Sequence, residues 1–383
     1  MIGHELICDL DGAAALAPEW DRLAVAASAP VACPAWVTGW WRHVAPPGMQ
    51  ARVVAVREGP QLIGVVPLRA VRRPAGVWEY RLMGDDFGVC MQPLAMPGRE
   101  WDVAAELGRA LRAGSPRAEV LSFGPMTLAS PWTADIAAAW PGRLAPLVRT
   151  RRLQGAPVIV LGEPDYEQWL AGLGSKLRRD LRRCERLFAQ AGGSTRWADA
   201  GSLAADARAF ARLHAARWAG RGWSRLAALG ERLPVWLEEL GAELIGSGRL
   251  GLCVLEIDGE PICVDLHLLA GAEAVGVNVG WDERRANLAP ARLALLRVVA
   301  AAYGRGAGRV HLGVGEPASK LRIANGRDAV AWTSLLLPGR GLGRAYGVLA
   351  PELARARARD MLTRSLPPER LAQVKRAAAR LRT

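Results

Sequence analysis

The spacing of apolar and polar residues along the chain predicts helices and strands over most of its length. Apolar residues at helical spacing indicate helices, and short apolar or alternating runs bounded by turn residues indicate strands. In the first part, these patterns predict helices around 20–25, over 34–43 and over 101–112, and strands over 51–57, 62–69, 78–83 and 119–123. In the second part, they predict helices over 203–218, 290–303 and 320–324, and strands over 250–257, 262–269, 274–281, 309–312 and 329–337. The order indicates an α+β protein with mixed, mainly antiparallel sheets, and the two parts share a layout of helices and hairpins.

The most basic helical pattern covers residues 173–188. Leu177, Leu181, Cys184 and Phe188 fall on one stripe that we expect to be buried, and Ser175 is the expected N-cap. Five arginines occupy the other positions, and they are Arg178, Arg179, Arg182, Arg183 and Arg186. Only two carboxylates in the segment oppose them, so the helix is either a solvated basic face or a site for an anionic ligand or partner.

The length of 383 residues is enough for two domains, each with its own core. A segment rich in Pro, Gly and Arg over 141–157 predicts the passage between them. We therefore expect a first domain over 1–150, a second over 151–340 and a basic tail over 341–383 that is helical from Pro351. The tail either packs as a pair of terminal helices or covers the enzyme, a partner or a membrane surface.

The composition constrains the partners and the compartment. The net charge of +13 and the isoelectric point near 10.4 favour a polyanionic partner, but a general arginine bias explains much of this charge, since lysine occurs only at Lys176, Lys320 and Lys375. No apolar run has transmembrane length, and the start lacks a secretory signal, so we expect a cytoplasmic protein. The six cysteines are scattered without a CxxC pair, which indicates reduced thiols and no metal site.

A polar face is expected on the strand over 262–269. Cys263, Asp265 and His267 alternate along it and share one side. A tight hairpin turn to the next strand would place Asp265 opposite Asn278 and His267 opposite Gly276. A polar face bordered by glycines in an apolar sheet suits a substrate pocket, although a register slip of one residue would remove it.

Several short motifs occur along the chain in a characteristic order and spacing. In the first half they are Glu19-Trp20-Asp21-Arg22-Leu23, Pro34-Ala35-Trp36 with Trp40-Trp41, Val65-Val66-Pro67-Leu68 and Gly84-Asp85-Asp86. In the second half they are Ser175-Lys176-Leu177-Arg178-Arg179, Leu213-His214 with Arg217-Trp218, Gly280-Trp281-Asp282, and Gly313-Val314-Gly315-Glu316-Pro317 with Lys320 and Arg322. Through these motifs the chain resembles, from about residue 18 to 337, the GNAT-fold acetyltransferases of the CelD/BcsL type associated with cellulose biosynthesis, which are related to Fem-type aminoacyltransferases.

The resemblance implies two tandem GNAT-like domains, of which the second carries the acyl-donor site. In GNAT enzymes the donor pyrophosphate lies on backbone amides between the fourth strand and the next helix. Here that turn contains no glycine, and the residues expected to bind the cofactor are Arg284, Arg285, Ala289, Ala291 and Arg292. An ordinary capped helix that begins at Pro290 is the alternative.

The resemblance also suggests roles for polar residues of the second half. Transfer of an acyl group to an amine needs a proton acceptor, for which Asp265 or His267 is expected, with Asn278 beside them. The alternative is that Asp265 pairs with an arginine and His267 is a hydrogen-bonded core residue. The residues expected to bind substrate are Lys176, Arg179, Arg183, Arg217, Trp218, Lys320 and Arg322. The family arrangement implies that the arginine helix and Arg217 line one cleft, whereas Lys320 has the alternative of pairing with Glu316.

Three functions follow from these features. The first is an N-acyltransferase that uses acetyl-CoA or another acyl-CoA as co-substrate and acts on an amine of a small molecule, sugar or peptide. The second is a Fem-like transferase whose donor is an aminoacyl-tRNA, bound by a broad cationic track. The third is a non-catalytic accessory module that binds anionic ligands. None of them requires a metal.

Overall fold

The computed structural model describes residues 1–219 and 224–365 of the chain. The strands are β1 (Ile2–Ile7), β2 (Gln50–Glu58), β3 (Gln61–Arg72), β4 (Trp78–Leu82), β5 (Leu94–Ala95), β6 (Val120–Thr127), β7 (Leu147–Val160), β8 (Gly193–Trp197), β9 (Leu250–Ile257), β10 (Glu260–Ala270), β11 (Glu273–Trp281), β12 (Arg309–His311) and β13 (Gly326–Leu336). The helices are α1 (Leu10–Ala15), α2 (Ala17–Ala26), α3 (Pro34–His43), α4 (Glu100–Ala113), α5 (Trp132–Ala138), α6 (Tyr166–Gly172), α7 (Ser175–Gln190), α8 (Leu203–Trp218), α9 (Arg232–Leu244), α10 (Pro290–Gly304), α11 (Ala318–Leu321) and α12 (Leu342–Ser365). Short 3₁₀ turns are η1 (Pro30–Ala32), η2 (Pro74–Gly76), η3 (Ala227–Leu229) and η4 (Glu283–Leu288).

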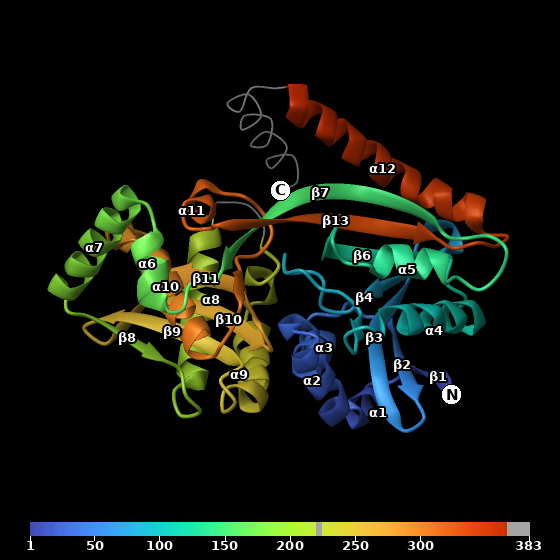
Figure 1. Ribbon diagram of the computed structural model, residues 1–383, viewed down its shortest axis with the longest axis horizontal. Coiled ribbons are helices and arrows are strands. Elements are labelled where there is room, and N and C mark those ends of the chain that lie inside the picture. Colours follow the sequence, from blue (N-terminus) through green and yellow to red (C-terminus); the bar gives the residue numbers. More distant parts are fainter. Residues whose placement is uncertain (220–223, 366–383) are drawn as a thin grey trace.

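One continuous sheet runs through both halves of the molecule (Figure 1). Its strand order is β1-β2-β3-β4-β6-β13-β7-β12-β11-β10-β9-β8, and β5 pairs with β3 beside this path. Most neighbours are antiparallel. The parallel pairs are β4 with β6 and β11 with β12 among the described strands.

The two halves repeat one layout. Each begins with a strand (β1 or β8), continues with helices, and forms three antiparallel strands (β2–β4 or β9–β11). A long helix (α4 or α10) then leads to a short parallel partner of the third strand (β6 or β12). This is the arrangement of tandem GNAT-like units that the family resemblance implies.

Strands β7 and β13 connect the halves and belong to both. β7 follows the first half in the chain but pairs with β12 of the second half, whereas β13 follows the second half and pairs with β6 of the first. β7 and β13 also pair with each other along their length (Figure 1). The segment over 141–157, expected as a passage between domains, therefore contains a strand of the sheet.

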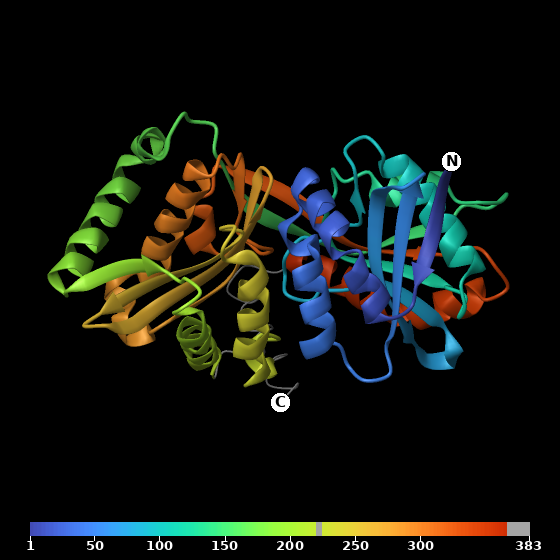
Figure 2. The ribbon, with the colours of Figure 1, turned by 90° about the horizontal axis from the view of Figure 1, so that it is seen from below.

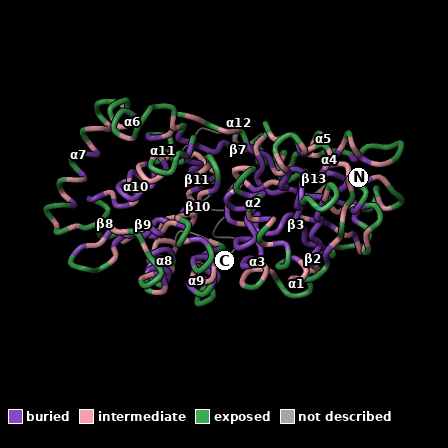
Figure 3. The backbone as a smooth tube through the Cα atoms, turned by 60° about the horizontal axis from the view of Figure 1, so that its bottom comes forward, coloured by how far each residue is buried: buried purple, intermediate pink, exposed green. Residues whose placement is uncertain are grey.

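Helices cover both faces of the sheet in each half. In the second half, α8 and α9 lie on one face and α7 and α10 on the other (Figure 2). The buried residues follow the sheet through the whole molecule (Figure 3). The largest apolar cluster joins the halves, since it contains Trp36 of α3 and Trp236 of α9, whose ring centroids are 4.8 Å apart.

Most expected elements are present, and two details differ. The predicted helices over 34–43 and 203–218 and the strand over 250–257 are confirmed to the residue. The expected N-cap Ser175 is wrong, because Gly174 precedes the first turn of α7 and no side chain caps it. Helix α12 begins at Leu342, and Pro351 lies inside it on an exposed position; the expected tail beyond residue 365 lies outside the described residues.

Helix α12 packs on the sheet through one apolar side. Ala345, Leu349 and Leu353 are buried against Leu336 of β13 and the start of β4. The first part of the expected tail is thus a packed helix. No helix in the described ranges is both long and apolar enough to cross a membrane.

Candidate active site

A gap in the sheet opens where β11 and β12 separate. The two strands pair in parallel over only three residues, from Glu273 with Arg309 to Val275 with His311. Beyond these pairs there is a glycine on each side, Gly276 on β11 and Gly313 after β12. A side-chain carbon at Gly276 would make only an ordinary contact, with the carbonyl oxygen of His311 at 3.6 Å, so this position has room for a small side chain.

Lys320 extends from α11 to this gap. Its Nζ donates a hydrogen bond to the carbonyl oxygen of Gly313 at 3.4 Å. The suggested pairing of Lys320 with Glu316 is wrong, because Glu316 accepts two hydrogen bonds from Arg327 instead. Burial, and secondly the charge of Arg217, lower the pKa of Lys320 to about 8. Lys320 is therefore a partly buried cation that forms no ion pair within the described residues.

The last turns of α8 form one wall of the site. Arg217 donates to the carbonyl oxygen of Val279 on β11 at 3.2 Å and lies over the Trp281 ring at 5.7 Å. His214, one turn earlier, bonds the Ser224 hydroxyl through Nε2 at 2.9 Å, and burial lowers the pKa of His214 to about 4. The indole of Trp218 lies 6.1 Å from the His214 ring between centroids.

His214 was not among the residues expected to bind substrate. It precedes Arg217 by three positions and Trp218 by four, which is the spacing that places helical side chains on one face. That spacing was visible in the sequence and identifies His214 as part of the same wall.

The predicted pairing of Asp265 with Asn278 is wrong. A β-bulge adds Val277 to β11, so Asp265 lies opposite Val279 and Asn278 opposite Leu266, while His267 lies opposite Gly276 as expected. Directly opposed residues share a face. Asn278 therefore lies on the α8 face, and Asp265 and His267 lie on the α10 face.

Asp265 and His267 are buried and form no hydrogen bond with each other. The closest approach of the Asp265 carboxylate to His267 Nδ1 is 4.0 Å. Burial raises the pKa of Asp265 to about 7 and lowers the pKa of His267 to about 3. The His267 ring packs over Gly251 and meets the edge of Trp197 at 5.3 Å between centroids, which holds it as a neutral ring.

His311 ends β12 beside the gap, and both of its ring nitrogens are engaged. Nδ1 accepts a hydrogen bond from the backbone N–H of Gly313 at 3.1 Å. The proton must then reside on Nε2, which faces the Cys90 sulfur at 3.4 Å. In this tautomer His311 has no free nitrogen to accept a proton from substrate.

The expected donor turn is η4 followed by α10. Ala289 stands between them in the left-handed conformation at φ 50° and ψ 50°, a region that favours glycine. Pro290 occupies the first helical turn as expected, and Ala291 and Arg292 follow within it. The helix thus presents its N-terminal turn at the end of β11, although the turn has no glycine.

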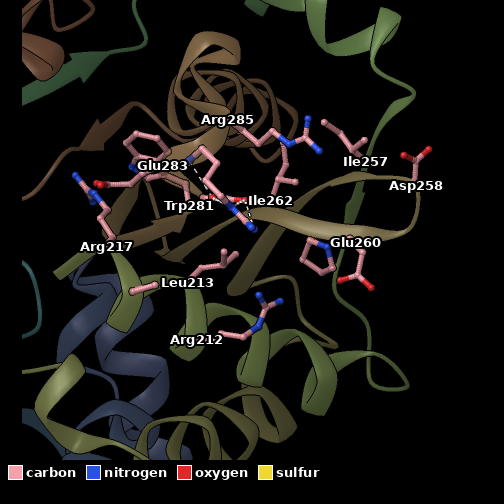
Figure 4. Close-up of a pocket in the computed structure, with 14 residues that line it drawn as sticks. Arg212, Leu213, Arg217, Ile257, Asp258, Glu260, Ile262, Trp281, Glu283 and Arg285 are labelled. Carbon is pink, nitrogen blue, oxygen red and sulfur yellow. Dashed lines mark hydrogen bonds and ion pairs between the residues drawn. The ribbon is translucent and has the colours of Figure 1, made fainter. Parts of the chain in front are cut away.

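Arg284 and Arg285 face a cavity on the α8 side. The cavity holds about 500 Å³ and lies between α8, the β9–β10 turn and η4 (Figure 4). Arg212 and Arg217 of α8 line it together with Arg284 and Arg285, and Trp281 forms part of its wall. Arg284 itself is held by the Asp282 carboxylate at 2.9 Å. The structure therefore brings one expected substrate residue and two expected donor residues to one cavity.

The arginine helix α7 lies elsewhere. It packs against β8, η4 and α10, on the sheet face opposite α8 (Figure 2). Lys176, Arg179 and Arg183 are exposed, and the cavity that contains Arg217 has no residue of α7. Arg322 is exposed at the end of α11. The expected common cleft of α7 and Arg217 is not seen.

No group of three or more His, Cys, Asp or Glu side chains in residues 1–219 and 224–365 is arranged to hold a metal ion.

The comparisons with known proteins agree with this geometry. Residues 175–320 match the family model described as "Acetyltransferase (GNAT) domain". A search of curated proteins finds no match.

Solved structures share the fold over most of the chain. FemX is 11% identical with a TM-score of 0.61, over 87% of this chain and 98% of FemX. A conserved protein of unknown function from Bacteroides thetaiotaomicron is 10% identical with a TM-score of 0.53, over 88% of this chain and all of that one (100%). The C-terminal domain of a putative lysylphosphatidylglycerol synthetase from Agrobacterium fabrum is 12% identical with a TM-score of 0.52, over 89% of this chain and 96% of that one. The chain therefore has a tandem GNAT-type fold, and its residues 175–320 are similar to the acetyltransferase domains of the GNAT family.

Proposed function

We propose that the protein is an N-acyltransferase that takes an acyl group from an acyl-CoA and transfers it to an amine of a small molecule, sugar or peptide. The observation that supports this proposal most is the cation of Lys320 at the gap between β11 and β12, without a carboxylate partner in the described residues. A partly desolvated cation at an open strand gap suits the stabilisation of negative charge that forms during a reaction. The narrower likeness to the CelD/BcsL type is part of the same proposal.

In the proposed reaction, the acceptor amine attacks the carbonyl carbon of the thioester. The carbonyl oxygen gains negative charge in the tetrahedral intermediate, and the carbon–sulfur bond then breaks to release CoA as its thiolate, which takes a proton from solvent. Lys320 stabilises the oxyanion as long as its ammonium is protonated, which the pKa of about 8 allows at neutral pH. The donor pyrophosphate lies at the first turn of α10, beside Ala289, Ala291 and Arg292.

The amine approaches from the α8 face, between Asn278 and the wall formed by His214, Arg217 and Trp218. Its proton passes to Asp265, whose pKa of about 7 suits a base at neutral pH. Asp265 lies on the opposite sheet face from Asn278, so this step of the proposal requires a chain of water molecules between the amine and Asp265. His267 does not act as the base in this proposal, because its neutral ring is enclosed between Gly251 and Trp197.

The first test is the substitution Lys320→Met, which removes the cation and keeps the length of the side chain. We expect calorimetric titration to show that acetyl-CoA still binds, while acyl transfer to a screened panel of amines falls about 100-fold or more. Arg143→Met is the matched control, since it removes an exposed cation in the loop after α5, away from the expected site residues. Acyl transfer that is equal in both variants would contradict the role of Lys320, and absence of acetyl-CoA binding to the unmodified protein would contradict an acetyl donor.

A second candidate is transfer from an aminoacyl-tRNA. The observation that favours it is the exposed basic face of α7, where Lys176 and the arginines form no ion pair within the described residues. A tRNA bound there would release counterions, so its affinity would fall steeply between low and moderate salt. Binding of acetyl-CoA that survives moderate salt, with no binding of tRNA, would reject this candidate; the reverse result would favour it.

A further inference from the structure

A segment of the first half, residues 84–92, lies against the site of the second half. Four of its residues each contact a different element there. Asp86 pairs with Arg225, which follows α8, and Phe87 packs against Trp236 of α9 with ring centroids 5.3 Å apart. Gly88 accepts a hydrogen bond from Val314 at 2.9 Å, and Cys90 contacts His311 at 3.4 Å.

Asp86 is fixed firmly within its own half. Its side chain is only 7% exposed, and Arg69 donates to its Oδ2 at 3.1 Å. Arg69 is itself held by Asp85 at 3.0 Å and by the face of the Trp40 ring, whose centroid is 4.4 Å away. Asp86 Oδ1 faces Arg225 Nη1 at 2.9 Å. The fixed carboxylate of Asp86 thus holds the longer and more exposed side chain of Arg225 in the other half.

Arg225 follows directly after Ser224 in the chain. The Ser224 hydroxyl bonds His214 Nε2 at 2.9 Å, and the Ser224 backbone oxygen accepts from Ala228 at 2.9 Å. The Arg225–Asp86 pair therefore fixes the start of the described segment between α8 and α9, and with it the hydroxyl that orients His214.

The first half has no comparable gap of its own. Its strands β4 and β6 also pair in parallel over three residues, from Glu79 with Val120 to Arg81 with Ser122, and then separate. The space beyond is filled by Asp85, whose side chain is fully buried and lies against Gly124. A side-chain carbon at Gly124 would lie 2.7 Å from the Asp85 carboxylate. The position that is open in the second half is thus occupied by an ionic cluster in the first.

We infer that the first half contributes no second acyl site and instead supports the site of the second half, with Asp86 as a positioning residue that holds Arg225 and thereby the Ser224–His214 side of the acceptor wall. Only the role of this wall in binding the acceptor amine rests on the proposed function. The anchoring itself is a property of the fold and can be tested without knowledge of the substrate.

The test compares hydrogen exchange in the full-length protein and in the variant Asp86→Asn, which removes the charge and keeps the shape. We expect the amides of residues 224–231 to exchange about tenfold faster, as for the loss of a charged hydrogen bond, while the amides of β11 are unchanged. Glu239→Gln is the matched control, because Glu239 of α9 forms another ion pair between the halves, with Arg42 of α3. It should leave residues 224–231 unchanged.

Two further variants make the result specific. Arg225→Lys retains the charge and should keep most of the protection, whereas Arg225→Met should lose at least as much protection as Asp86→Asn, and the double variant Asp86→Asn/Arg225→Met should add little to Arg225→Met. If an acceptor amine is found, its KM should rise about tenfold in Asp86→Asn while the Kd of acetyl-CoA stays the same. Unchanged exchange over 224–231, or faster exchange over the whole molecule, would overturn the inference. Failure of acetyl-CoA to bind would instead reject the acyl-CoA proposal, and the exchange result would stand.

Discussion

Two ionisable side chains of the second half are held away from water without an opposite charge beside them in the described structure. Lys320 contacts only a backbone oxygen, and Asp265 faces a neutral His267 at 4.0 Å. Such burial disfavours the charged form and costs stability. Lys320 lies at the gap between β11 and β12, and Asp265 lies on β10, the other neighbour of β11. Ionisable groups buried in this way are typical of reactive sites.

The pKa of Asp265 predicts how stability depends on pH. The folded protein binds this proton up to about pH 7, whereas the unfolded chain releases it near its ordinary value of 3.8, so stability falls as pH rises from about 4 to 7. The difference corresponds to about 4 kcal/mol. We expect Asp265→Asn to be more stable than the unmodified protein at pH 8 by up to this amount and nearly equal to it at pH 4, as measured by urea unfolding at each pH.

His267 provides an internal control for this measurement. Its pKa of about 3 lies below the ordinary 6.5, so its contribution is present above pH 6.5 and is lost as pH falls toward 3. That loss should appear in both proteins. If Asp265→Asn has the same pH dependence as the unmodified protein above pH 4, then Asp265 is ionised at its ordinary pKa in the folded state.

At the scale of elements, two glycines of β11 have different roles, one in helix packing and one beside the gap. Gly280 lies under α8, where an added side-chain carbon would be 2.7 Å from the backbone nitrogen of His214. Gly276 borders the gap, where the same carbon would only make an ordinary contact. One glycine therefore allows a helix to approach its strand, and the other keeps an opening.

The variants Gly280→Ala and Gly276→Ala should separate these two roles. Gly280→Ala forces α8 away from β11, and we expect it to lower the free energy of unfolding by about 1–3 kcal/mol. Gly276→Ala should leave the free energy of unfolding within about 0.5 kcal/mol but reduce acyl transfer, because it narrows the gap. Urea unfolding and a transfer assay measure the two effects. Equal destabilisation by both substitutions would contradict this division.

Local patterns predicted the elements that depend on local chemistry. α8 and β9 are correct to the residue, and the β9–β10 hairpin closes on Asp258 and Gly259, both with positive φ, as its turn residues indicate. The strands β1, β5, β7 and β8 and the helices α5, α6 and α9 were missed. Much of β7 and β8 is exposed and polar, so these strands carry little hydrophobic pattern and depend on partners far away in the chain.

The candidate site was predictable where it depends on residue type and not where it depends on register. Lys320 was predicted because lysine is scarce in the chain. Arg217 and Trp218 were predicted as neighbours because both lie in the last turn of α8. The position of Asn278 was lost because a single bulge residue, Val277, reverses the face on which the following side chain lies. The burial of Asp265 beneath α10 is a tertiary property that strand alternation alone does not reveal.

For the whole molecule, the two halves form one structural unit. The sheet is continuous, and Trp36, Phe87 and Trp236 pack together across the junction. Gly39 permits this contact, since a side-chain carbon there would lie 2.3 Å from the Trp236 ring. Domain motion about this junction would have to break both the sheet and an aromatic cluster.

We therefore expect a single unfolding transition. Urea curves followed by tryptophan fluorescence and by far-UV circular dichroism should coincide, because neither half can lose its sheet alone. Trp236→Ala should destabilise the whole protein by about 3–5 kcal/mol and still give one transition. Two separate transitions in the unmodified protein would show that the halves are independent.

The crossing of β7 and β13 has a consequence for synthesis on the ribosome. β6 ends at Thr127, but the strand that covers its open edge, β13, begins only at Gly326. During translation, the largely apolar edge of β6 therefore stays unpaired for about ten seconds or more at typical elongation rates, until β13 has been synthesised. An uncovered edge of this kind is a template for wrong pairing. The order of the strands thus makes the nascent chain, more than the finished protein, the state that needs protection by chaperones.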